Sequence, residues 1–156
     1  MAGYPDVAAK IDAFFARVEA RHGADMQCQT GCSDCCHTTL SVTRVEAEAI
    51  RGEVASWPAA RRAALAEIGP HCAALDAGGR CKIYAARPFV CRSHGAPIRM
   101  REGSLPVVQS CFRNFTRAAP DADCILDQTT LSALTLAVNG GDTERTDLAA
   151  LLAALC

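Results

Sequence analysis

The sequence predicts a mainly α-helical protein with a small β element, folded as one compact single domain over residues 1–156. The length fits one domain, since single domains commonly contain roughly 100–200 residues. Half of the residues are hydrophobic and only 5% are aromatic, a composition typical of Ala-rich helical proteins. Several segments also repeat apolar residues at three- and four-residue steps, which is the spacing of one helix face.

The N-terminal segment predicts an amphipathic helix over residues 5–21 that ends at Gly23. Its apolar residues are spaced to share one buried face: Val7, Ile11, Phe14, Phe15 and Val18. Residues 27–37 are rich in Cys, Gly, Ser and Asp, which predicts an irregular loop. Residues 38–42 favour an extended strand after that loop.

Two helices are expected to follow. Thr43 and Glu46 match a capping box, in which each side chain satisfies an exposed backbone N–H, and they predict a helix to about Val54. Its inward-facing residues are expected to be Val45, Ala49 and Ile50. Residues 56–58 (Ser-Trp-Pro) then begin a second helix that ends at Gly69-Pro70. This helix should bury Leu65 and Ile68.

The second half of the chain predicts short strands and two more helices. These are, in order, two short strands around a turn in residues 72–84, a helical turn at 88–91, a strand at 105–109, and helices at 126–138 and 146–156. Asn139-Gly140-Gly141 should end the first of these helices. The helix at 1–22 and those within 121–156 are expected to pack on a central core formed by residues 28–111.

Charge and hydropathy exclude some function classes. Sixteen Lys and Arg residues nearly balance 17 Asp and Glu residues, which argues against a nucleic-acid partner and against a disordered acidic chain. No segment has the roughly 20 apolar residues that a membrane-spanning helix needs. Asp6, Lys10 and Asp12 stand where a secretory signal would be apolar. We therefore expect a cytoplasmic protein with reduced thiols.

Ten cysteines are the main anomaly of this composition. Four lie within nine residues, and eight fall into one central set: Cys28, Cys32, Cys35, Cys36, Cys72, Cys81, Cys91 and Cys111. Thiolates are soft ligands for zinc, iron–sulfur clusters and Cu(I), so this set predicts a Cys-rich metal centre around which the domain is organised. Buried packing is the competing interpretation of any single cysteine, and it is preferred for Cys124 and Cys156.

The order of the cysteines favours several metal atoms over one. Eight thiolates match two four-ligand sites or one polynuclear centre. Cys35 and Cys36 are adjacent, and in an extended backbone successive side chains point to opposite sides. The two sulfurs are therefore better suited to different metal atoms than to a single ion, although one of them could instead be packed.

Basic and aromatic residues near the second half of the cysteine set are candidates to surround the centre. Residues 80–101 contain six basic side chains and no acidic one, and Arg can stabilise an anionic thiolate cluster. Arg87 and Arg92 bracket Cys91 and are the preferred counter-charges, while a solvated basic face is the alternative. Tyr84 and Phe89 are expected to exclude water from the centre.

Histidines could complete a zinc site if one cysteine is not a ligand. His37, His71 and His94 each lie within three residues of a cysteine of the central set. A surface or supporting role is the preferred interpretation, because some proximity is expected by chance among so many cysteines. His37 and His94 are the first two to test as ligands.

Two segments carry a resemblance to a known family. The run GCSDCCHTTLSVTRVEAEAI after Cys28, together with GGRCKIYAARPFVCRSHG, resembles the bacterial CxxCxxCC (YkgJ-type) cysteine-cluster proteins, which are described as zinc- or iron-chelating. The resemblance covers about residues 28–111 and implies that the eight central cysteines are the metal ligands. A flagellin lysine methylase is similar in carrying such a domain with an iron–sulfur cluster.

Two function classes remain open at this point. In the preferred one, the protein holds an iron–sulfur cluster, [4Fe-4S], for a redox, sensing or accessory role with a protein or redox partner. In the other, Zn²⁺, about two ions per chain, supports a structural, interaction or metal-handling module. The C-x3-C-x2-C spacing also occurs in enzymes that cleave S-adenosylmethionine, but their barrel scaffold takes roughly 250 residues. A single reactive cysteine is disfavoured by the size of the set.

Overall fold

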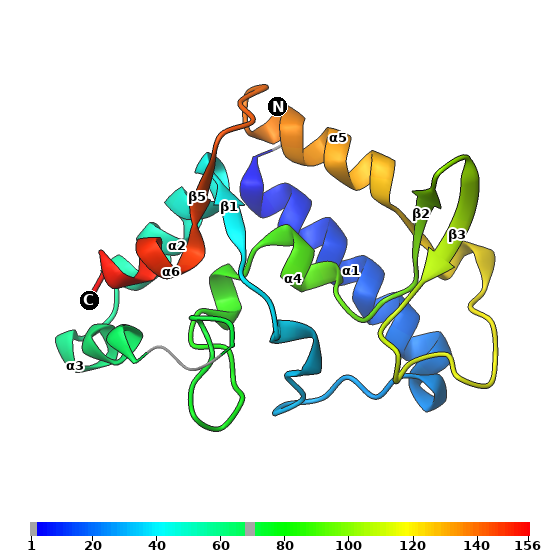
Figure 1. Ribbon diagram of the computed structural model, residues 1–156, viewed down its shortest axis with the longest axis horizontal. Coiled ribbons are helices and arrows are strands. Elements are labelled where there is room, and N and C mark those ends of the chain that lie inside the picture. The colour runs from blue at the N-terminus through cyan, green and yellow to red at the C-terminus, as the bar shows by residue number, and fades with distance from the viewer. Residues whose placement is uncertain (1–2, 68–70) are drawn as a thin grey trace. The chain divides into compact units, whose positions relative to one another are not determined.

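The computed structural model describes residues 3–67 and 71–156 (Figure 1). About 48% of the described residues are helical and 13% form strands and bridges, which confirms a mainly α-helical protein with a small β element. Contacts divide the chain into two units, and each contains two separate stretches of sequence. The first unit comprises Met1–Gln29 and Phe89–Val138, and the second comprises Thr30–Pro88 and Asn139–Cys156. A single domain over 1–156 stays a prediction.

The first unit contains three helices and a small sheet. The helices are α1 (Tyr4–His22), α4 (Phe89–Ser93) and α5 (Gln128–Val138), and the strands are β2 (Ile98–Glu102), β3 (Leu105–Gln109) and β4 (Leu126–Asp127). The strand order is β3-β2-β4, with β2 antiparallel to β3 and parallel to β4. Short 3₁₀ turns follow α1 and precede β4, namely η1 (Gly23–Asp25) and η5 (Ala122–Cys124).

Helix α1 confirms the predicted amphipathic face. Pro5 occupies the first turn, where its missing N–H is no loss, and the Gly3 N–H donates to Asp6 Oδ2 at 2.7 Å. The buried side chains are Val7, Ala8, Ile11, Phe14 and Val18. They pack in two clusters, one around Phe89 of α4 and one around Met26 and Cys124. Phe15 is only half-buried, so it lies at the edge of the predicted face.

The sheet of the first unit contains one predicted strand and one that the sequence analysis missed. Residues 105–109 form β3 as expected, and β2 pairs with it across a turn at Gly103, where φ is +62°. Strand β2 was missed although Arg99 and Arg101 alternate with its apolar residues, because the strand is short and most of it is solvent-exposed. Helix α5 begins two residues later than predicted because residues 126–127 pair with β2 as β4.

The second unit contains three helices and a two-stranded sheet. The helices are α2 (Arg44–Ala55), α3 (Ala59–Ala63) and α6 (Leu148–Ala153), and the antiparallel strands are β1 (Ser41–Thr43) and β5 (Arg145–Asp147). Three 3₁₀ turns are η2 (Asp34–Cys36), η3 (Ala64–Ala66) and η4 (Tyr84–Ala86). Its core combines Ile50 and Val54 of α2 with Leu151 and Leu152 of α6.

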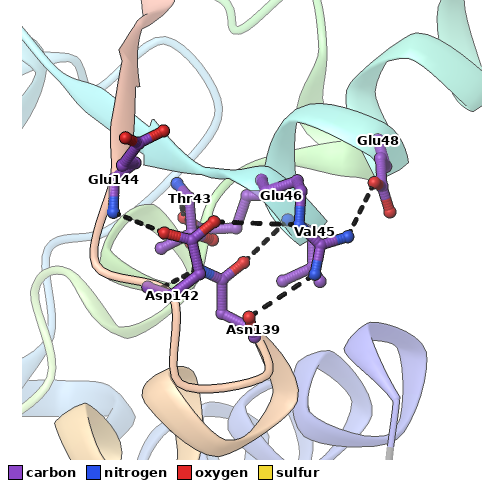
Figure 2. Close-up of polar contacts among 8 residues, drawn as sticks. Thr43, Val45, Glu46, Glu48, Asn139, Asp142 and Glu144 are labelled. Carbon is purple, nitrogen blue, oxygen red and sulfur yellow. Dashed lines mark hydrogen bonds and ion pairs between the residues drawn. The ribbon is translucent and has the colours of Figure 1, made fainter.

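The start of α2 confirms the predicted capping box and connects it to residues 139–144 (Figure 2). The Thr43 N–H donates to Glu46 Oε2 at 2.8 Å, and Glu46 is buried. Asn139, which is 1% exposed, accepts from the Val45 N–H at 3.1 Å and donates to the Asp142 carbonyl. Buried polar side chains are normally hydrogen-bonded. These bonds hold residues 139–142 against the start of α2.

Several predicted details of the second unit are wrong. Helix α2 buries Ala47, Ile50 and Val54, whereas Val45 and Ala49 are half-buried, because the buried face is rotated by about a quarter of a turn from the predicted one. The helix expected after Ser56 breaks into α3 and η3. It does bury Leu65, while Ile68 and its predicted end at Gly69-Pro70 lie outside the described residues.

Three further corrections concern the strands and the ends of the helices. The two strands predicted in 72–84 reduce to one bridge between Leu75 and Cys81. The predicted turn is present there, because the Asp76 carboxylate binds the backbone N–H groups of Gly78 and Arg80. The last helix covers Leu148–Ala153 rather than 146–156, since residues 145–147 pair with β1. Among the described residues, every helix is too short or too polar to cross a lipid bilayer.

Candidate metal centre

The eight central cysteines are divided between the two units. Cys28, Cys91 and Cys111 belong to the first unit. The second unit contains five, namely Cys32, Cys35, Cys36, Cys72 and Cys81. All eight are half-buried except Cys72, which is 7% exposed. In the described part of the chain, the sulfurs of these cysteines do not form a group of three within 4.8 Å of one another.

Cys28, in the first unit, lies in close contact with Gly95 and Asn114. Gly95 adopts φ of +95°, and a Cβ built on it would lie 2.6 Å from Cys28 Sγ. Any other residue at Gly95 would therefore be strained in its backbone and would collide with the sulfur. The close approach of backbone to sulfur requires glycine at this position.

Asn114 is the polar partner of Cys28. Its amide Nδ2 donates to Cys28 Sγ at 3.2 Å and to the Gly95 carbonyl at 2.8 Å, while its Oδ1 accepts from the Gln27 N–H at 2.8 Å. The Asn114 N–H also donates to the Cys111 carbonyl at 2.8 Å. Asn114 is 4% exposed, so it is a buried support for a thiolate at Cys28. The sequence analysis missed both Gly95 and Asn114.

Cys35 and Cys36 lie together on the 3₁₀ turn η2 of the second unit. A hydrogen bond with Cys36, together with burial, raises the pKa of Cys35 well above its ordinary value. The Cys36 N–H donates to the Ser33 carbonyl at 2.8 Å, which closes the turn. The thiolate is the form of cysteine that binds metals, and metal binding releases the thiol proton.

Backbone contacts connect the loop around residues 31–36 to the segment that carries Cys72 and Cys81. The Cys72 N–H donates to the Cys36 carbonyl at 3.0 Å. A Cβ on Gly79, where φ is +74°, would lie 3.2 Å from the Gly31 carbonyl oxygen. The turn at Gly79 therefore packs directly against the loop that contains Cys32.

Cys72 and Cys81 influence each other electrostatically. Burial raises the pKa of Cys81, and a negative charge on Cys72 raises it further. Arg87 and Lys82 act in the opposite direction and favour the thiolate of Cys81. A positive side chain near a sulfur ligand is the arrangement expected for Arg87 as a counter-charge.

The other residues predicted to surround the centre have different neighbours. Arg92 is 5% exposed and forms an ion pair with Asp12 at 2.6 Å in the first unit. Phe89 is buried and stacks on Tyr4 at a centroid distance of 4.9 Å. Tyr84 is 63% exposed, and the Arg87 guanidinium covers its ring at 3.9 Å. The prediction that the Tyr84 ring excludes water is wrong, because η4 presents the ring to solvent.

Two of the three histidines near the cysteines pair with each other. The rings of His37 and His71 lie 3.7 Å apart between centroids, and the two residues are the sequence neighbours of Cys36 and Cys72, whose backbones share a hydrogen bond. His94 is an exposed residue. Partial desolvation of its side chain nevertheless lowers its pKa. The neutral imidazole is the form that binds metals.

The two cysteines outside the set differ in environment. Cys124 is completely buried beside Phe14, Val18 and Met26, as its predicted packing requires. Cys156 is exposed, and its Sγ contacts only the Leu152 carbonyl at 3.3 Å among the hydrogen bonds of the described residues. Packing is therefore the wrong interpretation for Cys156, since helix α6 ends at Ala153 and leaves it in solvent.

Comparison with known proteins agrees with the arrangement of the cysteines. Residues 27–112 match the model of the CxxCxxCC family, whose description is "Putative zinc- or iron-chelating domain". No curated protein and no solved structure matches the chain. The match begins one residue before Cys28, ends one residue after Cys111 and covers more than half of the sequence. This metal-binding chain therefore belongs to the CxxCxxCC family of zinc- or iron-chelating domains.

Proposed function

We propose that this protein holds an iron–sulfur cluster, of the [4Fe-4S] type, and serves a redox, sensing or accessory role. A [4Fe-4S] cluster takes four thiolates, and we propose that its ligands come from the eight central cysteines: Cys28, Cys32, Cys35, Cys36, Cys72, Cys81, Cys91 and Cys111. When bound, such a cluster supplies one-electron chemistry at a potential set by its surroundings.

The observation that carries this proposal is the number of thiols in the second unit. Its five central cysteines are one more than the four ligands that a single tetrahedral ion takes. Cys35 and Cys36 lie together on one turn, and Cys72 and Cys81 interact electrostatically. A sulfur-only donor set of this size favours a centre with several metal atoms.

The protein's own groups have two roles in this proposal. Arg87 and Lys82 offset the negative charge of the thiolate at Cys81. Asn114 donates a hydrogen bond to Cys28 Sγ and fixes its position. Hydrogen bonds to ligand sulfurs and nearby positive charge both tune the potential of a cluster.

Zinc binding is the alternative, and the histidine pair is the observation that favours it. His37 and His71 bring two imidazoles next to Cys36 and Cys72. Mixed Cys and His ligands are typical of structural zinc sites. In that case the protein is a structural, interaction or metal-handling module with about two Zn²⁺ per chain.

Purification without oxygen distinguishes the two candidates. Iron, zinc and acid-labile sulfide are measured in the same sample as the visible absorbance. The iron–sulfur proposal predicts a coloured protein with iron and sulfide in equal amounts. A colourless protein that contains zinc and no sulfide would establish the alternative.

A pair of serine variants tests the assignment of the ligands. Cys32→Ser should lose metal and destabilise the second unit, because metal binding and folding are coupled. Cys156→Ser is the matched control, since Cys156 is exposed and lies outside the family match. Equal metal loss in both variants would contradict the division between central and peripheral cysteines.

A further inference from the structure

A second group of potential ligands lies in the first unit, outside the residues that match the family. The ligand atoms of His22, Asp121 and Cys124 are all within 4.8 Å of one another. In the described part of the chain, no other three His, Cys, Asp or Glu side chains converge this closely. Neither the family match nor the proposed cluster accounts for this convergence.

Local structure places these three side chains together. His22 is the last residue of α1, and Asp121 and Cys124 lie at the two ends of one 3₁₀ turn. The Cys124 N–H donates to the Asp121 carbonyl at 2.9 Å, which closes this turn. Residues three apart in a 3₁₀ turn project from the same side, so the aspartate and the cysteine both face the end of α1.

An ion pair holds the turn against α1 independently of any metal. The Arg21 guanidinium lies 2.5 Å from Asp123 Oδ2, and Arg17 donates to the Asp123 carbonyl at 3.2 Å. Arg21 lies 4.0 Å from Asp121 Oδ2. Because Asp123 is the closer partner of Arg21, the Asp121 carboxylate remains available to a cation.

The Nε2 atom of His22 faces the segment that carries Asp121. The Asp121 N–H donates to His22 Nε2 at 3.3 Å. Nε2 also lies 3.4 Å from Asp121 Oδ2. Neighbouring nitrogen and oxygen ligands of tetrahedral zinc, with bonds of about 2.0 Å, are separated by about 3.3 Å. The ring packs edge-on against Phe115, which restricts its rotation.

Burial orients the group with its sulfur inside and its carboxylate at the surface. Cys124 is 0% exposed, and the side chains of His22 and Asp121 are 12% and 59% exposed. An isolated buried thiolate is unfavourable, whereas a dication offsets the charges of one thiolate and one carboxylate. Three protein ligands leave a fourth position on the solvent side for water.

We propose that His22, Asp121 and Cys124 bind one Zn²⁺ ion in a mononuclear site separate from the central cysteines. Sulfur, imidazole nitrogen and carboxylate oxygen together suit zinc, whereas Ca²⁺ and Mg²⁺ prefer oxygen ligands alone. The ion joins the 3₁₀ turn to the end of α1 and keeps one coordination position open to water. Zinc takes the Nε2 lone pair from the long hydrogen bond of the Asp121 N–H.

The test measures the number of zinc ions bound per chain after the protein has been loaded with Zn²⁺. Protein purified without oxygen is dialysed against Zn²⁺, and bound zinc is measured for wild type, His22→Gln and Asp121→Asn. Glu19→Gln is the matched control, because it removes one negative charge from an exposed position of α1, three residues before His22. Asp121→Asn changes an exposed side chain without altering its size, so it keeps the test interpretable even if His22→Gln or Cys124→Ala folds poorly.

Wild type and Glu19→Gln should each bind one zinc ion more than His22→Gln and Asp121→Asn. The affinity of the ligand variants should fall by at least about 100-fold, since even a supporting residue costs roughly 10–100-fold. Co²⁺ bound in place of zinc should show a thiolate charge-transfer band in the difference spectrum between wild type and Asp121→Asn. Equal zinc content in wild type and both ligand variants would overturn the proposal, and so would loss of zinc in Glu19→Gln.

Discussion

Gly95→Ala is expected to destabilise the first unit and to disturb Cys28. The backbone at Gly95 has φ of +95°, and placing an L-residue in the left-handed region costs about 1–2 kcal/mol. The new Cβ would lie 2.6 Å from Cys28 Sγ, about 1 Å inside an ordinary contact of about 3.5–4.0 Å. Such overpacking adds about 1–3 kcal/mol, so the total loss is about 2–5 kcal/mol.

Gly103→Ala is the matched control for the backbone contribution. Gly103 also has positive φ, at +62°, but no atom lies within 4 Å of its built Cβ. This variant should therefore lose only about 1–2 kcal/mol. The difference between the two variants isolates the collision with Cys28.

Denaturant unfolding and metal analysis of the two variants test this reasoning. Metal sites tolerate ligand displacements of only about 0.2 Å, so a sulfur pushed by about 1 Å should lose its metal in Gly95→Ala. Gly103→Ala should retain the wild-type metal content. If both variants lose the same stability and both keep their metal, the inferred contact between Gly95 and Cys28 is wrong.

Three other variants test contacts within a single unit. Asn114→Ala should lower the free energy of unfolding, measured with denaturant, by about 2–4 kcal/mol. The reason is that the Gln27 N–H and the Gly95 carbonyl lose their partner. This variant should also reduce metal retention, and unchanged stability would contradict the buried role. Arg92→Met should lower the free energy of unfolding by about 1.5–3 kcal/mol. In a double-mutant cycle with Asp12→Asn the two effects should not add, and additive effects would refute the ion pair. Hydrogen bonds from the backbone N–H groups of Arg80 and Gly78 lower the pKa of Asp76. The Asp76 carboxylate therefore stabilises the fold fully above its ordinary pKa of about 3.9. This stabilisation is lost as the pH falls through the lowered pKa. Asp76→Ala should therefore be less stable than wild type at neutral pH and equally stable in acid, and a difference that persists in acid would exclude this carboxylate as the cause.

Local sequence patterns predicted much of the secondary structure. The capping box at Thr43 and Glu46 depends on residues three apart, and the structure confirms it. The buried face of α1 follows from regular helical spacing and is confirmed for the same reason. The face of α2 was misplaced because residues from α6, about 100 positions later, decide which side of the helix is buried.

The surroundings of the proposed metal ligands could not be predicted in this way. Asn114 is 86 residues from Cys28, and a lone asparagine in a polar loop gives no local signal. Gly95 could have been suspected, since a glycine after a predicted helical turn often has positive φ, but its contact with the sulfur is tertiary. The ligand group of His22 and Asp121 was missed for the same reason, although Asp121 and Cys124 show the spacing of one turn.

The interleaved composition of the two units has a consequence for synthesis on the ribosome. Residues 30–88 emerge long before residues 139–156, which supply Leu148, Leu151 and Leu152 to the same core. Translation proceeds at about 5–20 residues per second, so the thiols of the second unit wait for several seconds beside an incomplete apolar core. During that interval they are open to oxidation or to premature capture of a cation, and delivery of metal is best timed after Leu152 has left the exit tunnel.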